Sequence, residues 1–184
     1  MSTWQIDESH SAITFSVKHM MVSTVRGRFG RFGGTIEYDP EQPAEASVAV
    51  TIETASINTD WSQRDDHLRA ADFLDVAGHP EVTFRSTRVE VTSEGTARIH
   101  GDLSIRGVSR PVVLEAERLA IVSGMQGERR AAFEARTRID REAWGLTWNV
   151  GLEAGGWLVG KEITIVLDIA AVEQAVGQAA SRAA

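Results

Sequence analysis

The sequence predicts an all-β protein that folds as a single eight-stranded antiparallel β-barrel with a short helical insertion. Valine, isoleucine and threonine number 18, 12 and 14, against nine leucines, and β-branched side chains favour strands over helices. Sixteen glycines against four prolines indicate many turns and bends. Several segments alternate apolar and polar residues with the period of two expected of strands with one buried face.

The first clear alternation covers residues 12–20. Its inner face would carry Ile13, Phe15, Val17 and His19. In the next run, the apolar residues change from odd positions, ending at Phe29, to even positions, beginning at Phe32. One extra residue near positions 30–31 would keep both sets on the inner face, so we expect a β-bulge there.

Residues 59–75 break the alternation and are predicted to be helical, with acidic residues in the early turns and Leu68 on an apolar side. Alternation returns after this insertion and continues almost to the end of the chain. The remaining predicted strands are residues 47–53, which precede the insertion, and residues 81–91, 97–106, 112–122, 131–140 and 159–169, which follow it.

A long antiparallel meander must bury one apolar face, and closure into a barrel removes both of its edges. An eight-stranded barrel has room inside for side chains or for one small ligand. A two-sheet sandwich is the alternative architecture. No repeat or linker divides the chain, so we expect one barrel domain over residues 1–170, followed by an alanine-rich tail over residues 171–184.

The composition excludes several classes of protein. No cysteine occurs, which excludes disulfides, thiolate catalysis and cysteine-ligated metals. A net charge of −7, from 19 basic and 26 acidic side chains, argues against nucleic acid as a partner. We find neither a secretory signal pattern nor an apolar run of ~18 residues, and we therefore expect a cytoplasmic protein without a membrane span.

The polar residues form no recognisable catalytic motif. Neither a Gly-x-Ser-x-Gly elbow nor a glycine-rich loop between a strand and a helix occurs. The five histidines lack the spacing of common metal motifs, although a site built from His10, His19 and His67 is an alternative. His19 is either a core histidine bonded to a neighbour or a polar group that contacts a ligand. We expect no enzymatic activity, metal or cofactor.

Aromatic residues are distributed unevenly along the chain. Five of the six phenylalanines fall on the apolar strand faces, namely Phe15, Phe29, Phe32, Phe84 and Phe133. Trp61, Trp144, Trp148 and Trp157 fall between strands. In one interpretation the phenylalanines fill the core and the tryptophans plug one end. In the other, the barrel is an apolar tube with an aromatic mouth, suited to an elongated apolar ligand.

Several motifs occur in order and at the spacing of one known family. In the N-terminal part they are Trp4-Gln5-Ile6-Asp7-Glu8-Ser9-His10-Ser11, Ile13-Thr14-Phe15-Ser16-Val17-Lys18-His19, Val25-Arg26-Gly27-Arg28-Phe29 and Phe32-Gly33-Gly34. Further along they are Asp65-Asp66-His67-Leu68-Arg69, Asp72-Phe73-Leu74-Asp75, Pro80-Glu81-Val82-Thr83-Phe84, Gly101-Asp102-Leu103-Ser104-Ile105-Arg106-Gly107 and Asp140-Arg141. Through these motifs the chain resembles the YceI-like family over roughly residues 4–170.

The resemblance implies a lipocalin-like barrel that binds polyisoprenoids, quinone precursors or other long-chain amphiphiles, and that forms a homodimer. The family's late Asp-Arg-x-x-Phe-Gly pattern has Trp144 in place of phenylalanine here, and we expect the larger ring to narrow or reshape the pocket.

We therefore expect a non-enzymatic protein that sequesters a long apolar amphiphile of the polyisoprenoid, quinone-precursor or fatty-acyl type. The expected wall residues are Phe15, Val17, Phe29, Phe32, Phe84 and Phe133, with Trp144 and Trp148 at the mouth. The expected polar contacts are His19, His67, Asp66 and Arg141. Two alternatives are a lipid-modifying isomerase or hydrolase that uses His19 and His67, and a barrel filled by its own side chains that acts as a stress or dimerisation module.

Overall fold

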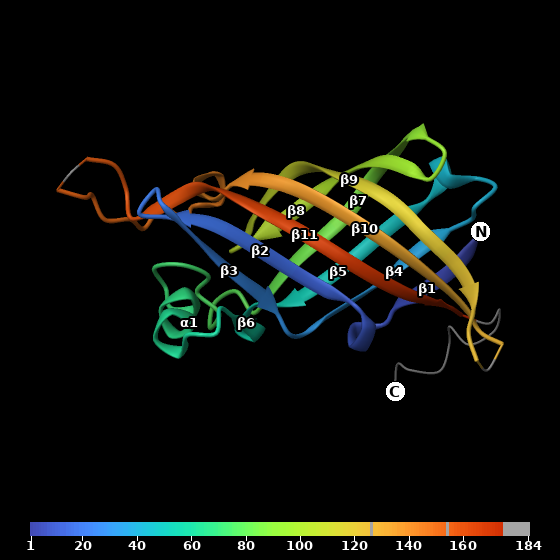
Figure 1. The fold of residues 1–184 in the computed structure, drawn as a ribbon, viewed down its shortest axis with the longest axis horizontal. Coiled ribbons are helices and arrows are strands. Elements are labelled where there is room, and N and C mark those ends of the chain that lie inside the picture. Colours follow the sequence, from blue (N-terminus) through green and yellow to red (C-terminus); the bar gives the residue numbers. More distant parts are fainter. Residues whose placement is uncertain (126, 154, 175–184) are drawn as a thin grey trace.

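A computed structural model describes residues 1–125, 127–153 and 155–174, and within them the fold consists of eleven strands, one α-helix and short 3₁₀ turns (Figure 1). The strands are β1 (Ser2–Ile6), β2 (Ala12–His19), β3 (Ser23–Phe29), β4 (Phe32–Tyr38), β5 (Ser47–Glu53), β6 (Ile57–Asn58), β7 (Glu81–Ser93), β8 (Thr96–Ile105), β9 (Val108–Ser123), β10 (Arg129–Asp140) and β11 (Val159–Glu173). The helical elements are α1 (Ser62–Arg69), η1 (Glu8–His10), η2 (Pro43–Glu45), η3 (Thr54–Ser56) and η4 (Arg141–Trp144).

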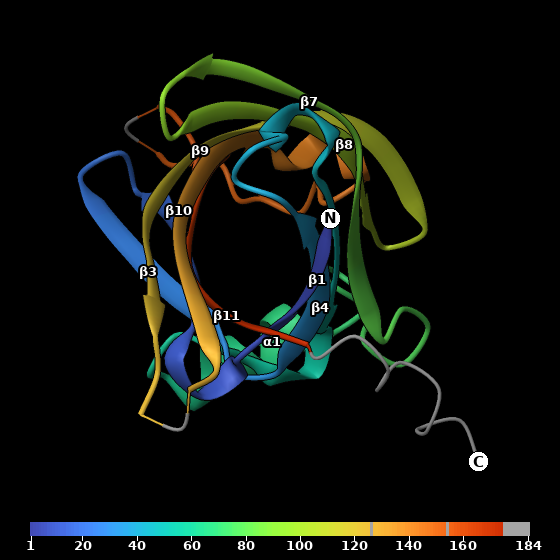
Figure 2. The ribbon, with the colours of Figure 1, turned by 90° about the vertical axis from the view of Figure 1, so that its right-hand side faces the viewer.

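The strands form one antiparallel sheet that closes on itself (Figure 2). Hydrogen-bonded neighbours follow the order β1-β4-β5-β7-β8-β9-β10-β11, and β1 pairs in addition with β11. This double pairing of β1 completes a ring of eight strands, and β2 and β3 extend the sheet from β11. The predicted eight-stranded antiparallel barrel is confirmed, and the two-sheet sandwich is not formed.

The first two long strands of the barrel are each interrupted. η1 separates β1 from β2, and residues 30–31 separate β3 from β4. β4 pairs with β1 and β5, whereas β3 pairs with β2 and, over two residues, with β6. At the break, the amide of Gly30 donates to the carbonyl of Ser56 over 3.1 Å.

The β-bulge predicted at residues 30–31 is therefore wrong, because the strand ends there and resumes with different partners. The change of apolar phase is nevertheless real. Phe29 is half-buried before the break and Phe32 is buried after it. Both rings are thus withdrawn from solvent although their positions differ by three, an odd number.

The five strands from β7 to β11 have 13, 10, 16, 12 and 15 residues, about twice the usual length of ~5–6. Since each residue advances a strand by about 3.3 Å, these strands form a tall wall. Register shifts at residues 86–88, 91–93 and 132–133 interrupt its ladders. Such irregularities increase the local twist and help the sheet to curl.

The helical insertion is shorter than predicted. Of residues 59–75, only Ser62–Arg69 form α1, and the carboxylate of Asp65 stabilises its start by accepting hydrogen bonds from the amide and hydroxyl of Thr59. Beyond Arg69 the chain turns back, with the amide of Leu74 donating to the carbonyl of Leu68, because Leu74 is then buried in the core. Within the described residues, no helix is long and apolar enough to cross a bilayer.

The C-terminal boundary also differs from the prediction. β11 continues through Glu173, so the first three residues of the predicted tail 171–184 belong to the barrel. Ala171 is fully buried and pairs with Ile6 of β1, which explains why this alanine is part of the core. Residues 175–184 lie outside the described residues.

Asp7 stabilises the kink between β1 and β2. Its carboxylate accepts hydrogen bonds from the hydroxyl of Ser9 (2.6 Å) and from Arg130 of β10 (2.9 Å), and lies 2.9 Å from Nδ1 of His10. These contacts, that of Ser9 first, hold the pKa of the Asp7 carboxyl well below its ordinary value. The ionised form of Asp7 is therefore favoured in the folded state.

We predict that Asp7→Asn lowers the free energy of unfolding by about 1 kcal/mol at pH 7, because the charged contacts of a partly exposed group are lost. Since the folded pKa of Asp7 is depressed, its stabilisation is complete above about pH 4 and disappears as the pH falls further. Urea unfolding of both proteins at pH 7 and pH 2.5 measures this convergence. Glu8→Gln, which removes a neighbouring exposed charge, is the control; an equal loss there would contradict the role of Asp7.

Candidate functional site: an apolar cavity through the barrel

A cavity of about 1050 Å³ occupies the interior of the barrel and is lined by residues from both of its ends. Its size is at the upper limit of the ~300–1,000 Å³ common for small-molecule sites. Most of its lining consists of inward-pointing aliphatic side chains, among them Ile13, Val25, Ile36, Val50, Val82, Leu103, Leu114, Ile139, Ile163, Ile165, Leu167 and Ile169. The alternative of a barrel filled by its own side chains is therefore wrong.

Two glycines keep aromatic rings close to the wall. A Cβ atom at Gly27 of β3 would collide with the ring of Phe15 on the paired strand β2. In the same way, a Cβ atom at Gly101 of β8 would collide with the ring of Phe84 on β7. Each ring thus covers a glycine, where a residue with a side chain would force the ring toward the lumen.

Of the side chains expected to bind a ligand, most are brought together around the cavity. Its lining includes Phe15, Val17, His19, Phe29, His67, Phe84, Phe133, Arg141 and Trp148. These residues come from β2, β3, α1, β7, β10, η4 and the loop before β11, so sequence-distant segments converge on one space.

Three expected residues are placed elsewhere. Phe32 is buried in the core but does not line the cavity. Asp66 is on the exposed face of α1, where it accepts a hydrogen bond from Arg69 over 3.2 Å. Trp144 is only 4% exposed, and its indole donates to the carbonyl of Leu103 over 3.0 Å. Its expected place at the mouth is thus wrong, because the indole is buried against the backbone of β8 and does not line the cavity.

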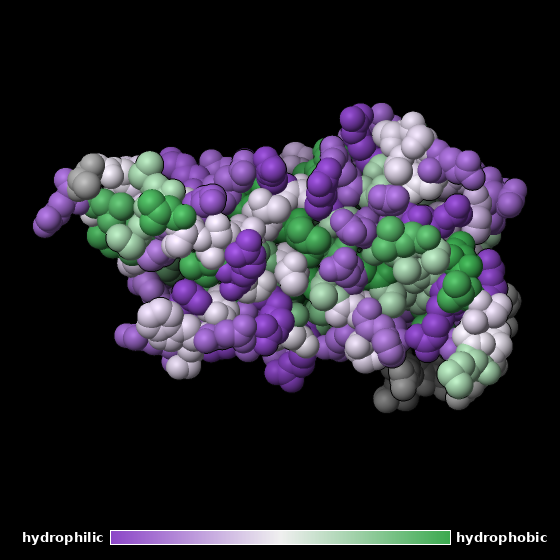
Figure 3. Space-filling view, viewed as in Figure 1, coloured by the Kyte–Doolittle hydropathy of each residue, from purple (hydrophilic) through white to green (hydrophobic). Residues whose placement is uncertain are grey.

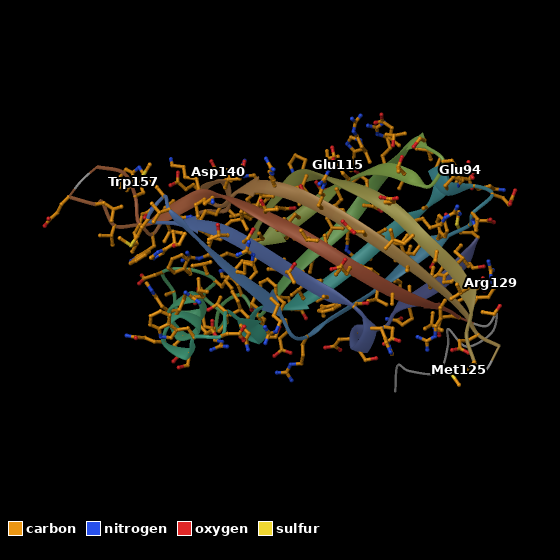
Figure 4. The ribbon with its side chains drawn as sticks, in the orientation of Figure 1. Glu94, Glu115, Met125, Arg129, Asp140 and Trp157 are labelled. Atoms are coloured by element: carbon orange, nitrogen blue, oxygen red, sulfur yellow. The ribbon has the colours of Figure 1, made fainter. Side chains whose placement is uncertain are left out.

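The two ends of the cavity carry opposite charges. At the end nearest α1, which we call the α1 end, the charged or titratable lining residues are His19, Arg64, His67 and Arg141. At the other end, beside the β7–β8 turn and η2, which we call the far end, they are Glu41, Glu94, Glu117 and Arg118. Figure 4 labels Glu94 at this far end. The cavity is therefore basic toward α1 and acidic on balance at its opposite end.

An aromatic cluster surrounds His67 at the α1 end. Its imidazole meets the rings of Trp148 and Phe73 edge-on, with centroids 4.6 and 5.0 Å away. Its Nε2 lies 3.5 Å from a carboxylate oxygen of Asp72. The imidazole of His19, in contrast, makes no hydrogen bond or ion pair with any described residue and is free to contact a ligand.

Arg141 is the most buried charged residue in the described chain, at 2% exposure. Its guanidinium donates to the backbone carbonyls of Gly160 (2.9 Å) and Trp148 (3.1 Å), and also to that of Leu146. Burial lowers the pKa of Arg141 below its ordinary value, an effect that nearby Glu142 and Asp140 oppose. Arg141 thus fastens the loop between η4 and β11 to the barrel.

Among the described residues, the geometry does not assemble a recognisable catalytic centre. In residues 1–125, 127–153 and 155–174 there is no group of three histidine, aspartate or glutamate side chains that could hold a metal ion. His67 has a carboxylate near it, but both side chains are partly exposed on the helical segment.

Sequence reasoning missed several lining residues. Leu146 and Leu158 belong to the irregular loop before β11, where no periodicity marks an inner face. Leu68 was assigned to the apolar side of a helix, and both Leu68 and Phe73 line the cavity. The aliphatic lining of β11 could be predicted from the sequence, because Ile163, Ile165 and Leu167 follow the period of two.

Comparisons with known proteins agree with this architecture. The profile of the YceI-like domain matches residues 4–171. A UPF0312 protein of Ectopseudomonas mendocina is 39% identical, over 77% of this chain and 74% of its own length. The crystal structure of the Campylobacter jejuni YceI protein is 29% identical with a TM-score of 0.74, covering 86% of this chain and 90% of that one. A Saccharophagus degradans domain described as polyisoprenoid binding is 14% identical with a TM-score of 0.69, covering 95% of this chain and all of that one.

We predict that Arg141→Met lowers the free energy of unfolding by about 3 kcal/mol, because several buried carbonyls lose their donor. Urea unfolding measures the loss, and hydrogen exchange should show faster exchange of amides in residues 146–159. Arg138→Met on the preceding strand β10 is the matched control, since its side chain is 71% exposed. An equal loss in both variants would contradict the anchoring role of Arg141.

Proposed function

The chain belongs to the YceI-like domain family, and from that premise we propose that it binds one long apolar amphiphile inside its barrel. The observation that carries this proposal is the continuous apolar cavity of about 1050 Å³. A protein of this size gains stability by filling its interior, so an empty space this large is costly unless a ligand occupies it.

The energetics favour a chain-like ligand. Burial of each methylene group contributes ~0.8 kcal/mol, so a long chain binds tightly through its apolar part alone. The few polar groups of the lining would then orient the head group. We propose a polyisoprenoid, a quinone precursor or a fatty-acyl chain, and the description of the S. degradans domain as polyisoprenoid binding supports the first of these.

We further propose that the protein is not an enzyme. A lipid-modifying isomerase or hydrolase would use His19 and His67, which both line the α1 end of the cavity. An acid–base pair needs groups that orient it, and the imidazole of His19 has no hydrogen-bond partner among the described residues. Location in the cytoplasm and formation of a homodimer stay predictions, which cell fractionation and sedimentation velocity can test.

The direct test is gentle extraction of the purified protein followed by mass spectrometry. A stoichiometric apolar chain supports the proposal. Absence of any lipid, together with failure to bind a fluorescent fatty-acyl probe from solution, would contradict it.

We predict that Ala135→Phe weakens binding of the fatty-acyl probe by at least ~10-fold, because Ala135 lines the lumen and a phenyl ring would occupy part of it. Ala120→Phe is the matched control, since Ala120 is exposed on the neighbouring strand β9. Probe fluorescence measures both affinities. An equal effect in both variants, or none in either, would place the ligand outside the barrel.

We predict that His19→Gln lowers the affinity for a probe with an oxygen-containing head group by no more than ~10-fold, since the amide of glutamine still donates one hydrogen bond. The enzymatic alternative requires that His19→Gln abolish turnover while binding persists, because glutamine does not exchange a proton near neutral pH. Product analysis by mass spectrometry distinguishes the two. A reaction of a lipid substrate that depends on His19 would overturn the non-enzymatic assignment.

A further inference from the structure

We propose that two adjacent loops at the α1 end form a tip that docks on a lipid bilayer, from which the barrel takes up its ligand. This apolar tip consists of Met20, Met21, Val22, Val150 and Trp157. Their exposed fractions are 47%, 68%, 83%, 46% and 57%, which is unusual for such large apolar side chains. The inference rests on the proposed function, because it names the source of the ligand.

The turn between β2 and β3 is built from residues that are poorly suited to it. Met20 and Met21 have φ angles of 50° and 62°, and the amide of Val22 donates to the carbonyl of His19 over 3.2 Å. Positive φ at both central residues, as in a type I′ turn, favours asparagine and glycine, because residues with larger side chains are strained in the left-handed region. Two methionines here lower the stability of the protein and also expose apolar surface. This combination indicates that they have a role other than stabilising the fold.

The second loop lies beside this turn and is held to it. The amide of Met20 donates to the carbonyl of Leu158 over 2.8 Å, and the amide of Leu158 donates to the carbonyl of Val150 over 2.9 Å. The side chain of Met21 lies against Gly156, where a Cβ atom would collide with its sulfur. Figure 4 places Trp157 at this extremity of the molecule, and Figure 3 shows hydrophobic residues gathered there.

The tip is continuous with the α1 end of the cavity. Leu158 and His19, which adjoin the two loops in sequence, both line the cavity. Trp61 also lines it and is 59% exposed, so the cavity reaches the surface at this end. A lipid chain leaving a membrane at the tip would therefore meet an apolar path into the barrel without crossing bulk water.

The chemistry of the tip favours a bilayer over a second copy of the chain. Stable protein interfaces bury ~800 Å² on each partner, which five side chains on a projecting pair of loops do not supply. Tryptophan and aliphatic residues suit the boundary between head groups and acyl chains. Glu153 is the only charged residue within residues 20–22 and 150–157, so apolar insertion would drive binding. The acidic far end would face away from the phosphate groups of the membrane.

The test uses the full chain, phosphatidylcholine vesicles and a fluorescent fatty-acyl probe. Met20→Asn/Met21→Gly installs the residues that a type I′ turn prefers, so this variant should fold at least as stably as the unchanged protein. We expect cosedimentation with vesicles to weaken ~10-fold or more, because two inserted side chains are lost, and uptake of the probe from vesicles to slow accordingly. Affinity for the probe in solution should not change.

Val22→Asn is the second variant, since its side chain is 83% exposed and its loss leaves the fold intact. Leu119→Thr/Val122→Thr removes comparable exposed apolar surface from β9 and should leave vesicle binding unchanged. Quenching of tryptophan fluorescence by brominated phosphatidylcholine should occur in the unchanged protein and decrease in Trp157→Phe.

Absence of vesicle binding by the unchanged protein, or equal loss in the tip and β9 variants, would overturn the docking proposal. So would sedimentation showing a dimer that dissociates in Met20→Asn/Met21→Gly, because the tip would then bind a second copy. If the probe binds from solution in these cases, the proposed ligand binding stands. If no probe binds from solution, the proposed function fails, and vesicle binding still decides the role of the tip.

Discussion

Closure of the sheet by β1 is the constraint on which the structure depends. Residues 2–6 pair with β4 on one side and with β11 on the other, joining the first strands of the chain to the last. Trp4 lies at this seam, fully buried, and its indole donates to the carbonyl of Tyr38 over 3.2 Å. Without this short strand both flanking strands would expose unpaired backbone groups, and the interior would open to water along one side. The enclosed cavity is therefore a consequence of the seam.

A closed ring of eight strands has an interior that side chains could fill, and small residues at inward positions decide how much space remains. Ala97, Ala116 and Ala135 line the cavity from three neighbouring strands, where larger residues would meet across the lumen. Gly27 and Gly101 act differently, since they leave space in the wall itself for aromatic rings. The phenylalanines thus contribute apolar surface without closing the tube.

The sequence predicted the parts of this fold that depend on local periodicity. The strand predicted over residues 47–53 has those bounds in the structure, and the lining of β11 follows its alternation. Choice of partner is not local: β1 has only five residues, and its role arises from two strands far away in the chain. The same limit explains the errors at the site. Asp66 and His67 are adjacent in sequence, yet the helix directs one to solvent and the other to the cavity. Trp144 was placed at the mouth because of its position in a loop, whereas in the structure its buried indole donates a hydrogen bond to the carbonyl of Leu103 on β8.

The polar groups of the cavity also constrain what recognition is possible. Arg141 is a cation at the lumen, but its guanidinium is engaged by the backbone of the loop that it anchors, so little of its hydrogen-bonding capacity remains for a head group. Arg64 is similarly engaged by the hydroxyl and carbonyl of Thr59. The α1 end is therefore electropositive while offering few free donors, of which His19 is one. A ligand would be oriented by this field and by a small number of hydrogen bonds, whereas its length and width would determine whether it fits. Because Arg141 and Arg64 are both engaged by the backbone, shape would contribute more to the selection of a ligand than hydrogen bonds would.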